Sequence, residues 1–447
     1  MTTTNQFIKP LTTKINQAGN LEIGGCDLVE LAETYATPLY VIDEYTLRSI
    51  CKDYKKAFEK YPKVQMMYAS KALCSLATSV IISQEGFGFD VVSGGEIYTV
   101  YKAGVDMSKV LFNGNNKSYD ELCMAVDLNV GRISVDNFFE LSLLSEIAKS
   151  KNKDISVLLR ITPGIECHTH EYIQTGHLDC KFGFDLTQID EAVELILNGY
   201  TNLTLHGLHA HIGSQIFETS IFSDEIEILV KELARLDEKY GLRLDEINIG
   251  GGLGVKYVES DLPPSVNDIA DIIVSKLYET TQKYGVELPT LILEPGRSII
   301  STSGVTLYTI GSSKQVPHAT KYVSIDGGMA DNPRPAMYQA EYFAQIANKP
   351  GMTETLQKVT IAGRFCESGD VLIKDFELPN PEEGDILCVF NTGAYNYSMA
   401  SNYNRAQKPG MVLVNNSQSD IIVSRETLDD LISHDVIPNG LKERCLS

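Results

Sequence analysis

The sequence of 447 residues predicts an α/β protein, a (β/α)8 TIM-like barrel with a second, C-terminal domain of β-sandwich or β-barrel type. Two observations predict it. Eight short β-prone runs alternate with helix-length segments, as in a chain of βαβ units. After residue 310, helical patterns become scarce, and short alternating runs separated by Gly, Pro and Asn replace them. A doubly wound open sheet shares the first pattern, which therefore favours the barrel without excluding that alternative.

The barrel strands are expected where β-prone residues cluster in short runs. Between the runs, sequence signals mark two helix starts. Asn137 is followed three residues later by Glu140, the spacing of a capping box. Ser265 follows two prolines and precedes apolar residues that repeat at i, i+3 and i+4. The predicted strands are 64–70, 89–93, 110–114, 132–136, 156–162, 204–213, 246–252 and 290–296.

The second domain is expected to be β-rich. Ahead of the barrel, residues 1–40 contain two short apolar stretches and a helix-like segment at 27–35. We therefore expect the barrel over residues 41–310, and a β-rich domain from residues 1–40 together with 311–447. The predicted strands of that domain are 321–326, 358–363, 370–378, 385–390, 411–416 and 420–424.

Composition excludes several classes of protein. Lys and Arg total 38 and Asp and Glu total 59, so the formal charge is −21, which is unfavourable for binding nucleic acid. Hydrophobic residues at 43% and charged residues at 22% are ordinary for a globular chain. No signal peptide and no apolar run of membrane-spanning length is present, and the nine cysteines form no C-x-x-C pair. We expect a cytoplasmic protein with reduced thiols and without a membrane partner.

The active site of a barrel lies at the carboxyl ends of its strands, so the residues that close each run are the candidates. Lys71 closes the first run, where it is either a functional amine or the first residue of an exposed loop. His209 and His211 lie near the end of the sixth run, on one side of the strand. An H-x-H pair can bind a metal, one histidine can stack on a planar cofactor, or both can be core residues.

The last two runs end in residues suited to an anion. The seventh run ends in glycines at 250–252 and 254, which allow the backbone to approach a phosphate, although turns also use glycine. The eighth run ends in Glu294, Gly296 and Arg297, where an arginine can hold a phosphate or pair with a surface acid. A lysine, a flat histidine, a glycine–arginine phosphate site and a carboxylate together match pyridoxal 5′-phosphate. We therefore expect this cofactor and no metal.

Stretches across both predicted domains carry a resemblance. They are YASKA (68–72), DVVSGGE (90–96), TPGIECHTHEYIQTG (162–176), KFGF (181–184), GLHAHIGSQ (207–215), GGGLG (250–254), EPGRS (294–298), RPAMY (334–338), CESGD (366–370) and TGAYNYSMASNYN (392–404). In this order the chain resembles the pyridoxal phosphate-dependent decarboxylases with an alanine-racemase-like barrel, and most closely their diaminopimelate decarboxylase branch. Two departures are Thr162, where the family usually has Asn, and Leu73, where we expect Asn.

The resemblance implies a role for each matching residue. Lys71 would be the Schiff-base lysine, His211 the residue stacked on the ring, and Glu294 the partner of the pyridine nitrogen. Cys366 would be a proton donor supplied by the partner subunit, with Glu367 on the distal amino group of the substrate. Further cofactor contacts would be Asp90, Ser214, Gly251, Gly252, Gly296, Arg297 and Tyr395, and further substrate contacts Arg297, Arg334, Tyr338 and Tyr395. The role of Asp326 stays open.

The resemblance also implies a reaction. CESGD has Glu after the cysteine, whereas ornithine-type relatives have Asp and a substrate without a distal carboxylate. The implied activity is decarboxylation of meso-2,6-diaminopimelate to L-lysine and CO2, the last step of lysine biosynthesis, in a homodimer whose subunits share active sites. Alternatives are a related decarboxylase of carboxynorspermidine, arginine or ornithine, a non-catalytic carrier of the cofactor, and a metal-dependent barrel hydrolase.

Overall fold

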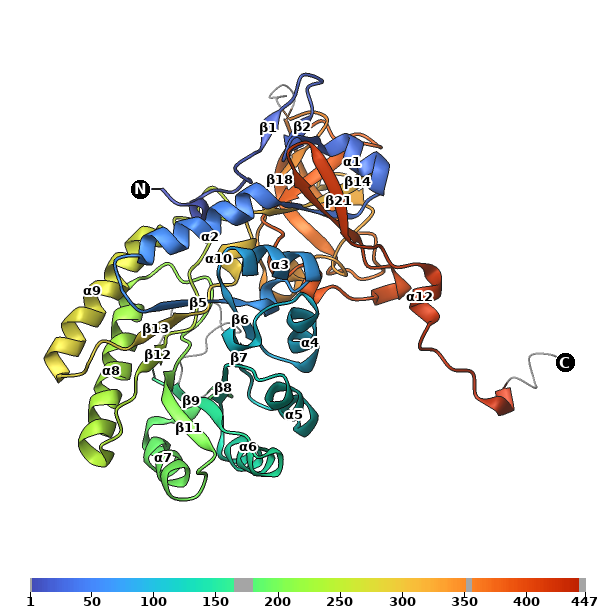
Figure 1. Ribbon diagram of the computed structural model, residues 1–447. Helices are drawn as coiled ribbons and strands as arrows, with labels where there is room; N and C mark the ends of the chain where they lie inside the picture. The colour runs from blue at the N-terminus through green and yellow to red at the C-terminus, as the bar shows by residue number, and fades with distance from the viewer. Residues whose placement is uncertain (1, 165–179, 351–355, 442–447) are drawn as a thin grey trace.

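The computed structural model describes residues 2–164, 180–350 and 356–441. Within them the eight predicted runs all form strands, and the strands close into one parallel barrel (Figure 1). Pairing of the last strand with the first, Leu291 beside Val64, decides for the barrel and against the open sheet. The strands are β5 (Val64–Ala69), β6 (Gly88–Val91), β7 (Val110–Phe112), β8 (Arg132–Val135), β9 (Ile155–Thr162), β11 (Leu203–His209), β12 (Glu246–Asn248) and β13 (Thr290–Leu293).

Helices follow the barrel strands and form its outer layer (Figure 1). Both predicted helix starts are confirmed. The Asn137 side chain accepts a hydrogen bond from the backbone of Glu140, and Ser265 forms a full capping box with Asp268. Glu140 does not bond back to Asn137, because its carboxylate is engaged by Lys117 and the backbone of Asp136. The helices are α3 (Leu76–Gln84), α4 (Gly94–Lys102), α5 (Tyr119–Asp127), α6 (Phe138–Lys151), α7 (Ile189–Asn198), α8 (Ser220–Tyr240), α9 (Val266–Tyr284) and α10 (Arg297–Ile300).

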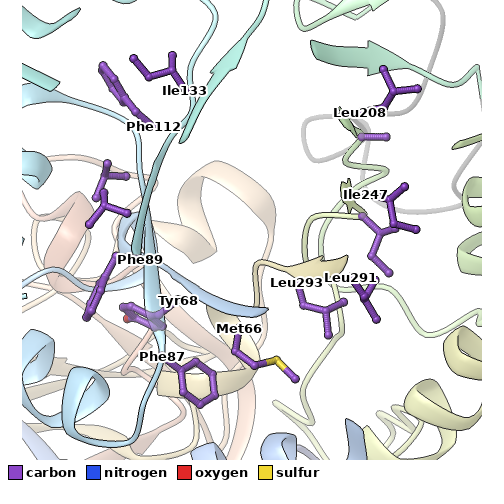
Figure 2. Packing of buried hydrophobic residues seen from close by; sticks show 14 of the residues in the cluster. Met66, Tyr68, Phe87, Phe89, Phe112, Ile133, Leu208, Ile247, Leu291 and Leu293 are labelled. Atoms are coloured by element: carbon purple, nitrogen blue, oxygen red, sulfur yellow. The ribbon is translucent and has the colours of Figure 1, made fainter. Parts of the chain in front are cut away.

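The barrel strands alternate between two environments, as the pleat requires. One set of side chains packs outward and belongs to one apolar cluster with residues of the helices; Figure 2 shows part of this cluster. The other set faces inward. A small apolar cluster of Met67, Leu111, Leu158 and Ile292 occupies part of the interior. On β7, β9 and β13, the position two residues beyond this cluster is polar and lies toward the carboxyl end of the barrel. On β6, Asp90 stands likewise, two residues after Gly88. These are the residues that build the site described below.

The second domain is a nine-stranded sheet (Figure 1). Its predicted strands are confirmed, and three further strands, β4, β14 and β16, join them. The strands are β4 (Leu39–Asp43), β14 (Gly304–Gln315), β15 (Lys321–Ile325), β16 (Ala344–Ile346), β17 (Leu356–Ala362), β18 (Val371–Pro379), β19 (Ile386–Phe390), β20 (Gly410–Asn415) and β21 (Gln418–Val423).

The barrel limits of 41 and 310 therefore need correction. β4 lies between β14 and β20, so residues 41–43 and 304–310 belong to the second sheet. β4 is buried at every position, and the pattern of an apolar run does not indicate which sheet the strand will join. The N-terminal segment also packs on this domain, because Leu21, Ile23 and Leu28 share an apolar cluster with strands β14 and β20. This segment forms β1 (Lys14–Ile15), β2 (Leu21–Ile23), β3 (Cys26–Asp27) and α1 (Leu28–Tyr35).

The two domains meet where the chain enters and leaves the barrel. Helix α2 (Glu44–Phe58) follows β4 and leads to β5, and its Tyr54 hydroxyl bonds to Ser298 of α10 at 2.6 Å.

No helix among the described residues is long and apolar enough to cross a bilayer.

A buried ion pair ties the loop after β7 to helix α6. Lys117 donates to Glu140 Oε1 at 2.7 Å, and the two side chains are 1% and 2% exposed. The ammonium also donates to the carbonyls of Gly114 and Ser134, so its three protons are all engaged. Burial lowers the pKa of Lys117 and raises that of Glu140, although the opposite charge of each partner counteracts this effect. Each charge is tolerated only because the other is present.

Replacing Lys117→Met leaves the Glu140 carboxylate buried without a cation, and we expect a loss of about 3–5 kcal/mol in the free energy of unfolding. The double variant Lys117→Met/Glu140→Leu should recover most of that loss. Urea denaturation followed by circular dichroism measures both. The matched control is Lys151→Met, which breaks the exposed pair with Asp127 and should cost less than about 1 kcal/mol. Equal losses at the two lysines would contradict the argument.

Candidate active site

A cavity of about 850 Å³ opens at the carboxyl ends of the barrel strands, between the barrel and the second domain. Its volume is in the usual range for small-molecule sites. The structure brings many of the predicted residues together here, from both domains. Those that line the cavity are Lys71, Asp90, His211, Ser214, Glu294, Arg297, Arg334, Tyr338 and Tyr395.

Lys71 lies in a single 3₁₀ turn directly after β5. The second domain holds this turn in place, because the Tyr395 backbone and the Ser398 hydroxyl both donate to the Ala72 carbonyl, at 2.9 and 3.1 Å. The Lys71 side chain extends into the cavity. Burial alone would lower the pKa of its amine, but Tyr395, Asp90 and Glu294 outweigh burial and raise the pKa. The protein therefore holds a protonated amine against a cluster of acidic groups.

Two carboxylates lie close together in the barrel interior, where both accept a hydrogen bond from the same amide. Asn113 donates to both, at 2.6 Å to Asp90 and 2.9 Å to Glu294, and Asn248 adds a second bond to Glu294 at 2.6 Å. Burial, and then the charge of Glu294, raise the pKa of Asp90 to about 7, while Lys71 opposes that rise. Amide donors keep Glu294 oriented without supplying a full positive charge. The arrangement gives one oriented carboxylate beside one that titrates near neutrality.

His209 and His211 both face the interior, as their spacing predicts, but they have different partners. Nδ1 of His209 is 2.8 Å from the Ser134 hydroxyl, and its Nε2 lies 3.6 Å from Glu294. His211 lines the cavity, and its Nδ1 accepts from the Gly251 backbone at 3.4 Å. Burial, followed by nearby cations, lowers the pKa of both imidazoles well below the usual value. Both rings are therefore neutral at pH 7.

The glycines after β12 and β13 permit close packing. A Cβ on Gly251 would lie 2.2 Å from the Glu294 carbonyl oxygen, and one on Gly296 would lie 2.9 Å from the Ala69 Cβ. Gly252 has a φ of +112°, which disfavours other residues. These observations explain why glycine stands at each position. The predicted direct contact of the three glycines with the cofactor stays a prediction.

Two arginines are buried in the cavity wall. Arg297 donates to Tyr257 at 2.8 Å and to Ser214 at 3.0 Å, and its guanidinium lies over the Tyr395 ring at 4.8 Å. Arg334, from the short helix α11 (Arg334–Tyr338) of the second domain, donates to Tyr342 at 2.5 Å. Among the described residues, no carboxylate lies within ion-pair distance of either guanidinium. Two buried cations without an acid define a site for an anion.

Comparisons with known proteins agree with this geometry. Residues 47–301 match the family model described as "Pyridoxal-dependent decarboxylase, pyridoxal binding domain". The chain is 48% identical to a diaminopimelate decarboxylase of Synechocystis, over 98% of this chain and 94% of that protein. It is 47% identical to the Bacillus subtilis enzyme of that name, over 97% of this chain and 99% of that protein. The chain belongs to the diaminopimelate decarboxylase family of pyridoxal-dependent decarboxylases.

Solved structures support the same assignment. A diaminopimelate decarboxylase of M. jannaschii in complex with L-lysine superposes with a TM-score of 0.91, at 37% identity, over 97% of this chain and 100% of that chain. The Helicobacter pylori enzyme complexed with L-lysine gives a TM-score of 0.83 at 31% identity, over 93% and 99%. A lysine/ornithine decarboxylase of Vibrio vulnificus, at 21% identity and a TM-score of 0.74, shares the fold.

The cofactor of this family member is pyridoxal 5′-phosphate, and the cavity fits it. The buried Nε of Arg297 and Nε2 of His209 have no hydrogen-bond partner among the described residues, so polar atoms remain for a ligand. An amine, a neutral imidazole, an oriented carboxylate and a guanidinium without an acid partner among the described residues surround one space.

Elsewhere in the described residues, a cluster of metal-ligand type is formed by His206, Asp245 and Glu246. This cluster lies at the amino end of β12, where Arg132 already binds both carboxylate oxygens of Glu246.

Besides the three glycines, Cys366 and Glu367 are predicted residues that do not line this cavity. Both are exposed, in a loop between β17 and β18. The Cys366 backbone donates to the side chain of Asn404 at 3.0 Å, which ties the loop to the segment that follows Tyr395. Asp326 also lies elsewhere and has a structural role, because Thr37 and the Thr309 backbone both donate to its carboxylate.

The two departures from the family pattern do not disturb the cavity. Leu73 is 1% exposed and packs in the apolar layer outside the barrel. Thr162 donates to the Phe182 carbonyl at 2.5 Å, at the edge of the described residues. Most of the matching stretch 162–176, including His168 and His170, lies outside the described residues.

The sequence argument missed Asn113, Arg160, Asn248 and Tyr257. Asn113 and Asn248 orient the carboxylates, Arg160 lies 3.9 Å from Asp136, and Tyr257 binds Arg297. A signal was available for three of them. Asn113 and Asn248 stand at or next to a strand end, and Arg160 stands two residues before one, all at positions with the inward parity of their strands. Tyr257 lies in a loop, where no periodicity marks it.

The raised pKa of Asp90 predicts a stability effect. The unfolded chain ionises this group near pH 4 and the folded chain near pH 7, so rising pH between those values favours unfolding. Relative to Asp90→Asn, the free energy of unfolding of the cofactor-free wild type should fall between about pH 4 and about pH 7. Above about pH 7, the difference between the two proteins should stay constant. Thermal unfolding of both cofactor-free proteins across this range tests it. In a Glu294→Gln background, the loss should end at a lower pH, and a difference independent of pH would refute the interpretation.

Proposed function

We propose that the protein decarboxylates meso-2,6-diaminopimelate to L-lysine and CO2, the last step of lysine biosynthesis. The observation that carries the proposal is a pair of buried arginines that have no acid partner among the described residues, in one cavity with Lys71 and Glu294. A substrate that has only an amine at its far end would leave the Arg334 cation uncompensated. Diaminopimelate has a carboxylate there, and the near full-length relatives are diaminopimelate decarboxylases.

At the reacting end, Lys71 would hold the cofactor through an imine, with His211 against the ring and Ser214 with Arg297 toward the phosphate. Bound pyridoxal phosphate supplies an electron sink for the pair left when CO2 departs. Glu294 would keep a proton on the pyridine nitrogen, since Asn113 and Asn248 both donate to its Oε1 and orient the group. Neutral imidazoles at His209 and His211 add no positive charge that would compete for this carboxylate.

At the far end, Arg297, Arg334 and Tyr338 would bind the carboxylate that is retained in lysine. Both guanidiniums are held by phenols, so they are positioned before the substrate arrives. Pinning the far end selects which of the two carboxylates stands over the cofactor. Tyr395 lies over Arg297 and is bonded to the Lys71 turn, so it would contact both cofactor and substrate.

Purified protein should absorb at the visible edge, from the imine between Lys71 and the cofactor, and should release CO2 and lysine from meso-diaminopimelate. Lys71→Ala should lose that absorbance and nearly all activity, because no other amine holds the cofactor. Absorbance spectra and a coupled CO2 assay measure both, with Lys63→Ala, at the barrel exterior, as the control. An unchanged spectrum in Lys71→Ala would contradict the assignment. Faster release of CO2 from ornithine, arginine or carboxynorspermidine would favour one of those substrates instead.

We propose further that the enzyme is a homodimer with shared sites, in which the β-rich domain completes the site of the neighbouring chain. Cys366 and Glu367 are exposed and do not line the cavity of their own chain, whereas a proton donor must reach the reacting carbon. Cys366 from the partner would supply that proton, and Glu367 would bind the distal amine. A cytoplasmic location fits the cysteines that the structure describes, which are all free thiols.

Mixing two inactive variants tests the shared site. Lys71→Ala and Cys366→Ala should each lose most activity as homodimers. In a mixed dimer, one of the two sites has an intact Lys71 and an intact partner cysteine, so random reassociation should restore about a quarter of wild-type activity. The readout is lysine formation after joint refolding, with each variant refolded alone as the control. Full activity in Cys366→Ala, or no recovery on mixing, would overturn the proposal.

A further inference from the structure

Tyr257 is a buried tyrosine of the cavity wall that lies between the two arginines. It belongs to the loop between β12 and α9, and thus to the barrel, as Arg297 does. Its ring, however, packs in the apolar cluster of the second domain, together with Tyr342 and strand β14. Tyr257 therefore lies at the junction of the two domains, at the place where an arginine from each reaches the cavity.

The contacts of Tyr257 engage both arginines by different parts of the side chain. Its hydroxyl oxygen accepts from Arg297 at 2.8 Å and from Ser301 at 3.2 Å. Its ring face lies 4.7 Å from the guanidinium of Arg334, a cation–π distance. Although burial alone would raise the pKa of Tyr257, the charges of Arg297 and Arg334 outweigh burial and lower the pKa.

A second tyrosine completes the support. Tyr342 meets Tyr257 edge to face, with ring centroids 5.4 Å apart, and its hydroxyl is bonded to Arg334 at 2.5 Å. Arg334 therefore has a phenol oxygen on one side and an aromatic face on the other. Two cations in one buried wall repel each other, and these rings partly offset that repulsion without an acid that would compete with an anionic ligand.

The loop that presents Tyr257 is fixed on all sides. The Gln215 side chain bonds to both the backbone N–H and the carbonyl of Val255. The Lys256 carbonyl accepts from Asn391 of the second domain at 2.7 Å, and the Tyr257 backbone donates to Asp261 at 2.9 Å. Such anchoring is typical of a residue that must hold others at a set spacing.

We propose that Tyr257 is a positioning residue that sets the relative placement of Arg297 and Arg334, and so determines selectivity for substrates with a carboxylate at the far end. This inference rests on the proposed function. Removing the phenol oxygen frees the Nη1 side of Arg297 while the ring under Arg334 stays. The two guanidiniums then no longer meet one carboxylate in a shared geometry. A ligand that lacks the far carboxylate does not use this geometry and is unaffected.

The test compares L-lysine with cadaverine on the cofactor-loaded enzyme. The two molecules share the amine chain, and only L-lysine has the carboxylate. In the wild type, L-lysine should bind more tightly by isothermal titration calorimetry. Tyr257→Phe should weaken L-lysine by about tenfold and leave cadaverine within about twofold, as expected for one lost hydrogen bond to a charged group. The steady-state counterpart is a raised KM for diaminopimelate with little change in kcat.

The control is Tyr61→Phe, which removes another buried phenol hydroxyl, bonded to the Pro289 carbonyl at 2.7 Å and outside the cavity. It should change neither ligand. Tyr257→Leu, which also removes the ring, should weaken L-lysine further than Tyr257→Phe does. Equal loss for both ligands in Tyr257→Phe, or no loss for either, would overturn the role of Tyr257. If the wild type itself does not prefer L-lysine to cadaverine, the proposed function fails instead.

Discussion

Every strand of the barrel sends alternate side chains inward, and the barrel's part of the site depends on this constraint. On β6, β7, β9 and β13, one inward position near Met67 of β5 holds an apolar or small residue. The next inward position toward the carboxyl end of each strand is polar. The outward positions of the same strands belong to the apolar layer under the helices. A shift of one residue in any strand would exchange the two sets, burying charges against the helices and placing leucines in the cavity. Packing of the outer apolar layer therefore fixes which side chains of the strands face the cavity.

Two acids and an amine of the cavity are buried close to one another. Amide groups separate and orient Asp90 and Glu294, and the Lys71 amine opposes their combined charge. The arginines follow a different rule, since phenols and aromatic faces support them in place of acids. Paired acids would have made a stable wall with no affinity for anions. Because the described residues place no carboxylate beside these buried cations, a negatively charged ligand is favoured there.

Much of the site could be read from the sequence because strand ends and side-chain parity are local properties. Lys71, His211 and Glu294 follow recognisable strands, and the structure places all three in the cavity. Asn113 and Asn248 stand in equivalent inward positions, which is a local signal, but only the tertiary structure shows that both bind Glu294. Tyr257 carried no signal, because its importance comes from Arg334, a residue distant in sequence on another domain. Residues 41–43 of strand β4 were likewise placed in the barrel, since the partner strands β14 and β20 are far along the chain.

The sequence by itself determined the order of the strands and helices, the side of each strand that is polar, and the kinds of reactive group available. These depend on residues within a few positions of one another. Only the tertiary structure decided that the strands close into a barrel, that the second domain meets its carboxyl end, and that Arg297 and Arg334 share one wall around Tyr257. Closure and domain contact join segments hundreds of residues apart, and their geometry follows from packing across those segments, which no local pattern encodes.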